Sequence, residues 1–107
     1  MSVVTVYAVY AVFANADEAQ RIGRAMIEEK LAACVNLLGD IRSIYRWQGK
    51  TEEATEAAAL FKTSSAAADR LIERIAELHS YAVPCITSWP VDKVLPAYAE
   101  WVEESIT

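Results

Sequence analysis

The chain has 107 residues, of which 54% are hydrophobic and 23% charged, and its formal net charge is −5. This length and composition predict a single folded domain over residues 1–107, and they exclude a two-domain enzyme or a disordered chain. The acidic balance argues against nucleic acid or an anionic membrane as the main partner, because both require a surface rich in Lys and Arg. No apolar run approaches the roughly 20 residues that span a bilayer.

The first element that we expect is a buried strand over residues 3–13, because this apolar run is rich in Val and Tyr. A short secretory signal is the alternative, since Ala14-Asn15-Ala16 looks like a small-residue cleavage site, but no Lys or Arg precedes the run. Asn15 and Glu18 then form a capping-box-like pair at the start of an amphipathic helix. Its apolar stripe consists of Ala19, Ile22, Met26, Ile27 and Leu31.

A long β-hairpin is expected over residues 33–63. Its first strand extends to Trp47 with a bend or bulge at Gly39, a polar turn covers 48–53, and the second strand covers 54–63. The many alanines of the second strand would also suit a helix. Beyond the bend, alternation places one set of side chains on a single face: Ile41, Ser43, Tyr45 and Trp47.

The remaining elements are a helix, a fourth strand and a short last helix. Ser64 or Ser65 caps the helix, which ends near His79-Ser80. The strand covers 83–91, and Pro96 opens the last helix. The order βαββαβ followed by a helix predicts an α+β, ferredoxin-like sandwich with one antiparallel sheet and helices on one face.

The hairpin is longer than one small sheet needs. Its aromatic residues would project beyond the domain, and monomers rarely expose such patches or long bare edges. The sequence therefore predicts a homo-oligomer in which Tyr45, Arg46 and Trp47 contact a neighbouring copy. The aromatic residues as a group are expected in core and subunit packing, with a ligand cleft between subunits as the alternative: Tyr45, Trp47, Tyr81, Tyr98 and Trp101.

Five residues are candidate metal ligands: Cys34, Glu52, Glu56, His79 and Cys85. Thiolates suit Cu(I), a neutral imidazole suits several transition metals, and carboxylates suit hard divalent cations. Each type also has a structural interpretation. The histidine could bond the last carbonyls of its helix, Cys34 could be a small core residue, and the carboxylates could be a solvated face or pair with Arg42 or Arg46 between subunits.

No constellation of catalytic residues is found. The chain has three glycines and no Gly-rich phosphate loop, and no motif pairs its one histidine with a Ser or Cys. We therefore expect neither enzyme activity nor an organic cofactor. The two cysteines are too few for a disulfide framework, which predicts reduced thiols and a cytoplasmic protein.

Ordered motifs extend over about 100 residues of the chain. They are Glu29 to Asn36, Ser43 to Lys50, Glu52, Glu56, Leu60 to Thr63, His79 to Pro84, Pro90-Val91 and Tyr98 to Trp101. Together they resemble the CutA family, the divalent-cation-tolerance proteins. The resemblance implies a cytosolic homotrimer of ferredoxin-like subunits joined through the long hairpins, with a link to copper and other divalent cations.

The chain also departs from the family pattern. Val12 and Ala14 stand where Thr and Pro are usual, and Ser80 replaces the proline of a common His-Pro-Tyr. Cys85 replaces a usual glutamate, which removes a carboxylate and adds a soft thiolate, so we expect any metal site to differ from the family's.

Two hypotheses follow. The first is a homotrimeric protein of copper tolerance or homeostasis that binds divalent metal ions without catalysis. The alternative is a trimeric signalling or interaction scaffold, similar to PII-type regulators, whose intersubunit clefts bind a small molecule or a protein partner.

Overall fold

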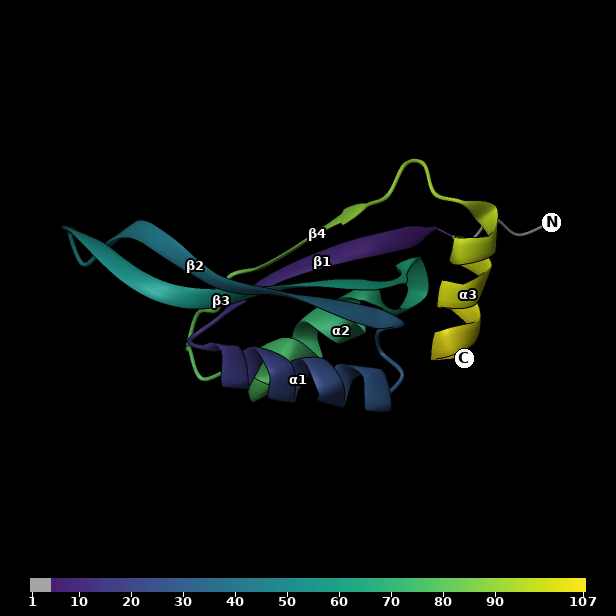
Figure 1. Cartoon of the computed structure of the whole chain (residues 1–107), viewed down its shortest axis with the longest axis horizontal. Helices are drawn as coiled ribbons and strands as arrows, with labels where there is room; N and C mark the ends of the chain where they lie inside the picture. The colour runs from purple at the N-terminus through teal and green to yellow at the C-terminus, as the bar shows by residue number, and fades with distance from the viewer. Residues whose placement is uncertain (1–4) are drawn as a thin grey trace.

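A computed structural model describes residues 5–107, which form one four-stranded antiparallel sheet and three helices. The elements are β1 (Val6–Phe13), α1 (Ala16–Glu28), β2 (Cys34–Trp47), β3 (Lys50–Ser64), α2 (Ser65–Leu78), β4 (Ile86–Pro90) and α3 (Pro96–Ile106). The strand order is β2-β3-β1-β4, with α1 and α2 on one face and α3 at one end (Figure 1). The predicted α+β, ferredoxin-like sandwich is confirmed.

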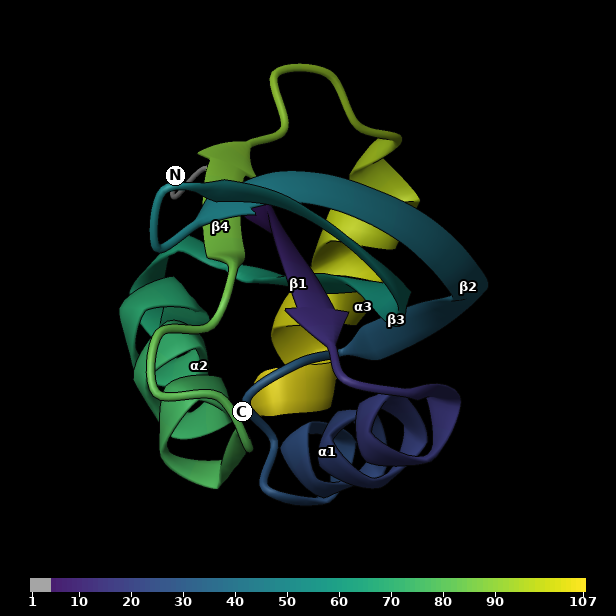
Figure 2. The same cartoon turned by 90° about the vertical axis from the view of Figure 1, so that its left-hand side faces the viewer.

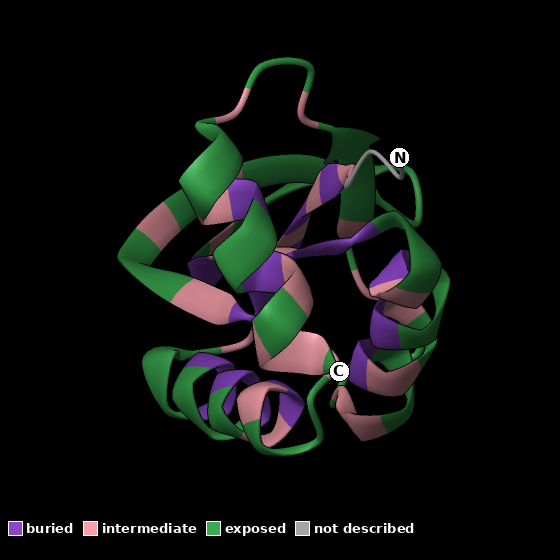
Figure 3. Cartoon of the chain, turned by 90° about the vertical axis from the view of Figure 1, so that its right-hand side faces the viewer, coloured by how far each residue is buried: buried purple, intermediate pink, exposed green. Residues whose placement is uncertain are grey.

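The main core lies between the sheet and the two long helices. Both helices run side by side beneath the sheet, as Figure 2 shows from the hairpin end. Their buried residues face the strands (Figure 3). The largest buried side chains of this core are Phe13, Ile22, Met26, Phe61, Leu71 and Ile75. A second cluster packs α3 against the sheet through Val6, Ala33, Ala99 and Val102.

The predicted helix starts are confirmed, and one predicted end is wrong. Asn15 Oδ1 accepts a hydrogen bond from the Glu18 N–H at 2.9 Å, and Ser64 Oγ accepts one from the Ala67 N–H at 3.3 Å. The predicted apolar stripe of the first helix continues to Leu31, but α1 stops at Glu28. Lys30 has a φ of 59°, a left-handed conformation that does not continue a right-handed helix.

The hairpin has the predicted bulge but a much tighter turn. The pairing shifts between Leu37 and Gly39, where φ is 87°. The polar turn over 48–53 is wrong, because only Gln48 and Gly49 lie between the paired residues Trp47 and Lys50. Both turn residues have positive φ, as two-residue hairpin turns require. The polar residues 50–53 therefore belong to β3.

The hairpin extends beyond the rest of the sheet. β1 stops pairing with β3 at Ala57, so residues 50–56 pair only with β2. This two-stranded extension gives the chain its elongated dimensions of 52 × 26 × 21 Å. Its radius of gyration is 14.6 Å, against about 13 Å for a compact chain of this length. A two-stranded ribbon is barely stable alone, so contacts along this extension matter for its order.

The fourth strand is shorter than predicted. The expected strand over 83–91 was too long at both ends, because β4 covers only Ile86–Pro90. In this register Pro84 would stand opposite Phe13, and proline has no N–H to donate to the ladder. A single bond from the Val12 N–H to the Cys85 carbonyl, 3.1 Å long, ends the pairing. Residues 79–85 thus form a connecting segment instead of a strand.

The last helix starts at Pro96 as predicted, and Tyr98 and Trp101 stack on its surface with ring centroids 5.7 Å apart. None of the helices within residues 5–107 has the length and apolar character needed to cross a membrane.

Candidate functional site

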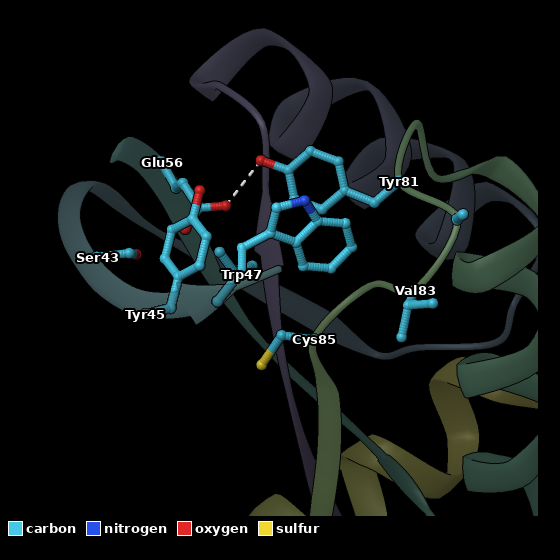
Figure 4. A pocket seen from close by; sticks show the side chains of 9 residues that line it. Ser43, Tyr45, Trp47, Glu56, Tyr81, Val83 and Cys85 are labelled. Atoms are coloured by element: carbon cyan, nitrogen blue, oxygen red, sulfur yellow. Dashed lines mark hydrogen bonds between the residues drawn. The ribbon is translucent and has the colours of Figure 1, made fainter. Parts of the chain in front are cut away.

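A pocket of about 570 Å³ lies where the hairpin passes the end of β1 (Figure 4). Three elements and the segment between α2 and β4 supply its walls. They contribute Val12 from β1, Ser43, Tyr45 and Trp47 from β2, Glu56 from β3, and Tyr81, Ala82, Val83 and Cys85 from the segment. The predicted alternation along β2 is confirmed here, since Ser43, Tyr45 and Trp47 all face the same cavity.

Glu56 is a buried carboxylate at this pocket, with 9% of its surface exposed. Its Oε2 accepts a hydrogen bond from the Tyr81 hydroxyl at 2.7 Å. Burial and the adjacent Glu56 carboxylate raise the pKa of Tyr81 to about 12, so the phenol keeps its proton and remains the donor. Within residues 5–107, no ion pair joins Glu56 to a basic side chain. The pocket therefore contains a carboxylate with no basic partner in that range.

His79 holds the segment that forms one wall of the pocket. Its Nε2 lies 2.7 Å from the Val12 carbonyl oxygen, and its Nδ1 accepts a hydrogen bond from the Tyr81 N–H at 3.0 Å. These partners require the neutral tautomer with the proton on Nε2. The ring also stacks on Phe13, with centroids 5.1 Å apart. Metal coordination by His79 would require one of its two hydrogen bonds to break.

Glu18 fixes the same segment from the other side. Its Oε1 accepts a hydrogen bond from the Ala14 N–H at 3.0 Å, and its Oε2 accepts one from the Ser80 N–H at 2.9 Å. Burial raises the pKa of Glu18, but the hydrogen bonds from Ser80 and Ala14, with the nearby His79, outweigh it and hold the pKa below its ordinary value. One carboxylate thus ties the β1–α1 turn to the α2–β4 segment.

Cys34 lies at the opposite end of the hairpin. Its Sγ is 3.3 Å from the hydroxyl oxygen of Tyr98, and the side chain is half-buried. Burial and this contact raise the pKa of Tyr98 to about 12. Glu52 pairs with Tyr45, eleven residues further along β2 than Cys34. At about 3.3 Å per residue, Cys34 and Glu52 are separated by about 36 Å and cannot share an ion within one chain.

The candidate ligands therefore do not assemble in a single chain. Glu56 and exposed Cys85 line the pocket. His79 does not line it but contacts the backbone of Val12, which does. Cys34 and Glu52 do not line it. Throughout the described range 5–107, no three His, Cys, Asp or Glu side chains gather closely enough to hold a metal ion. Sequence reasoning did not find the bond between Glu56 and Tyr81. The region itself was indicated by the candidate ligands Glu56 and Cys85 and by the aromatic group that includes Tyr81.

Three charged residues of the hairpin do not line the pocket, namely Arg42, Arg46 and Glu53. Arg42 pairs with Glu53 at 3.5 Å, and both side chains are exposed, so the pair adds little stability. Arg46 is exposed and its Nη1 donates to the Gly49 carbonyl at 3.5 Å. No contact in the single chain tests the predicted role of Arg46 between subunits.

A family model described as "CutA1 divalent ion tolerance protein" matches residues 7–105. The chain belongs to this CutA1 family. Individual CutA proteins agree over nearly the full length. The chain is 37% identical to the divalent-cation tolerance protein CutA of Archaeoglobus fulgidus over 98 residues, which cover 92% of this chain and 95% of that protein. It is 42% identical to the CutA protein of Thermus thermophilus over 89 residues, which cover 83% and 86%.

Solved CutA structures have the same fold. The structure named periplasmic divalent cation tolerance protein CutA from Archaeoglobus fulgidus superimposes with a TM-score of 0.92 at 35% sequence identity. The match covers 95% of this chain and 99% of that one. The CutA family names describe tolerance of divalent cations and no reaction, which suggests a role other than catalysis.

Proposed function

We propose that this protein is a homotrimer that supports divalent-cation tolerance by binding copper or another divalent ion without catalysing a reaction. The match of residues 7–105 to the CutA1 family carries the link to divalent cations. The assembly, the identity of the metal and its ligands are proposed in addition to this link.

The hairpin supports the trimer. Residues 50–56 pair only with β2, so this ribbon lacks the neighbouring strands that would stabilise it. The ribbon exposes large hydrophobic side chains in the single chain, with Ile44 at 70% and Trp47 at 57%. A second copy that covers this ribbon would bury the apolar surface and pair the open edge of β2.

The position of the thiols supports a metal site that is completed between subunits. Cys85 is exposed and shares the pocket with Glu56, so these two offer a soft and a hard donor. A full coordination shell needs further donors, which we assign to a neighbouring copy. Cys34, His79 and Glu52 would contribute only where such a copy brings them to the same ion.

Isothermal titration of the native oligomer with Cu(I), Cu(II) and Zn(II) tests this proposal. Micromolar or tighter Cu(I) binding should weaken strongly in Cys85→Ser and should persist in the matched variant Cys34→Ser. Equal binding by the wild type and both variants would leave only surface coordination and would contradict the proposed site. A monomeric mass of the wild type in light scattering would contradict the trimer.

We further propose a cytoplasmic location, because both cysteines are unpaired, as expected in a reducing compartment. The solved relative from Archaeoglobus fulgidus is named periplasmic. Fractionation of the native host distinguishes the two compartments.

A second candidate function is a trimeric scaffold that binds a small molecule. The observation that favours it is the pocket between the hairpin and the segment 81–85, which falls within the usual size of about 300–1,000 Å³ for ligand sites. Loss of copper binding without loss of small-molecule binding would separate the two functions.

A further inference from the structure

We propose that the pocket between the hairpin and the segment 81–85 binds a small organic cation, an alkylammonium or arylammonium group. This inference deepens the second candidate function and does not depend on copper binding. It rests on the combination of aromatic rings and one uncompensated carboxylate in a single cavity (Figure 4).

The aromatic rings provide the first argument. Tyr45 and Trp47 line the pocket from β2, and Tyr81 lines it from the opposite segment. The faces of tyrosine and tryptophan attract cations within about 6 Å of the ring centroid, and sites with several such rings recognise quaternary ammonium groups. Tyr81 is far from Tyr45 and Trp47 in the sequence, and the fold brings the three rings to one cavity.

The carboxylate provides the second argument. Glu56 is more than nine-tenths buried, and no basic side chain of residues 5–107 forms an ion pair with it. A buried charge without a counter-charge is costly, so a positive ligand beside Glu56 would be stabilised. The Tyr81 hydroxyl, 2.7 Å away, orients the carboxylate and occupies one of its acceptor sites, which leaves others for a ligand.

The remaining lining favours an organic cation over an anion, and over a metal ion held by one chain alone. Among residues 5–107, no Lys, Arg or His lines the pocket, so it offers no positive charge to an anion. Within residues 5–107, one carboxylate and one thiol are too few donors to hold a bare metal ion unless a neighbouring copy supplies more. Val12, Ala82 and Val83 give the cavity apolar walls that suit the methyl or methylene groups of an ammonium ion.

The test compares two probes of the same shape. Choline carries a quaternary nitrogen, and 3,3-dimethylbutan-1-ol has a carbon in its place. Isothermal titration of the native oligomer should give an affinity for choline about tenfold or more above that of the neutral alcohol. Equal affinities, or no binding of choline, would overturn the proposal.

Glu56→Gln provides the decisive variant. The amide has the same shape, and its oxygen can still accept from the Tyr81 hydroxyl, so the wall is preserved while the charge is removed. Choline affinity should fall about tenfold in this variant, and the affinity for the alcohol should not change. The matched control is Glu53→Gln, which removes the same charge from the same strand at an exposed position paired with Arg42. It should leave choline binding unchanged.

Two further measurements separate this proposal from the copper site and from assembly. Cys85→Ser should retain choline binding whatever it does to Cu(I) binding, because it leaves Glu56 and the three aromatic rings of the pocket unchanged. The mass of Glu56→Gln in light scattering should equal that of the wild type. If Glu56→Gln binds choline as tightly as Glu53→Gln at an unchanged mass, the carboxylate has no role and the proposal is wrong.

Discussion

Replacing Glu18 with alanine should destabilise the protein by about 3 kcal/mol. Glu18 is 5% exposed, and its two carboxylate oxygens accept the N–H groups of Ala14 and Ser80, which lie 66 residues apart in the chain. Alanine leaves both donors without their partner. The substitution thus loosens the segment that carries Tyr81 and Cys85 into the pocket.

The expected magnitude follows from these two bonds. A hydrogen bond to a charged group contributes about 1.5–3 kcal/mol, so two would contribute about 3–6 kcal/mol. Ser80 is exposed, so water can replace the carboxylate at its N–H and recover part of that loss. Glu18 also carries a negative charge in the first turn of α1, where the helix dipole favours it by about 0.3–1 kcal/mol. We therefore expect a loss of about 3 kcal/mol, at the lower end of the range for two such hydrogen bonds.

The effect should depend on pH in a defined direction. The pKa of Glu18 is lowered from an ordinary 4.5, because hydrogen bonds from Ser80 and Ala14 and the nearby His79 outweigh burial, which raises it. A carboxyl with a lowered folded-state pKa contributes stability that is present above its unfolded pKa and is lost as the pH falls through its folded pKa. The difference between wild type and Glu18→Ala should therefore be full at pH 7 and should shrink below about pH 4.5.

Urea unfolding at one fixed protein concentration measures this difference, because the stability of the proposed trimer would depend on concentration. Asp17→Ala is the matched control, since it removes an exposed carboxylate from the same helical turn. A loss below about 1 kcal/mol for Glu18→Ala, or a loss equal to that of Asp17→Ala, would refute the reasoning. So would a difference that stays constant from pH 7 to pH 4.

Three other substitutions or measurements test the assembly, the thiols and the core. Trp47→Glu should lower the mass in light scattering from about three times 11.8 kDa, because an unpaired charge would be buried in the interface, and an unchanged mass would place Trp47 outside it. A thiol reagent should label exposed Cys85 faster than half-buried Cys34, as mass spectrometry of each peptide would show, and Cu(I) should slow the reaction of Cys85. The reverse order would remove Cys85 from the proposed metal site. Thr63→Val should cost about 1–2 kcal/mol in urea unfolding, because the buried hydroxyl donates to the Leu31 carbonyl at 2.7 Å, and a neutral effect would contradict that value.

Local patterns in the sequence were enough to predict the order of the elements. Asn15 and Ser64 marked helix starts because an N-cap needs a side-chain oxygen next to the first turn, and both oxygens accept the expected N–H groups. Gly39 marked the bulge because its positive φ is one that few other residues adopt. These features depend on neighbours within a few residues, so the sequence contains them directly.

Features that depend on distant partners were missed or misjudged. The point at which β4 begins depends on the position of Pro84 opposite Phe13, and this register cannot be predicted from either segment alone. His79 donates a hydrogen bond to the Val12 carbonyl and accepts one from the Tyr81 N–H, so its chemistry is decided by β1 and by the next segment rather than by its own helix. The pocket arises for the same reason, since Glu56 and Tyr81 meet only in the folded chain.

The central position of β1 has a consequence for the order in which the chain folds. On one side β1 pairs with β3, which is distant from it in the sequence. On the other side it pairs with β4, which is more distant still, since Tyr7 lies opposite Pro90, 83 residues away. The hairpin, by contrast, closes through a two-residue turn. Local contacts form much faster than distant ones, so the hairpin is expected to be complete while both edges of β1 are still open. In the proposed trimer, a neighbouring chain would therefore meet a finished hairpin before the sheet behind it has closed. Exchange of strands between nascent chains would then compete with completion of each chain's own sheet.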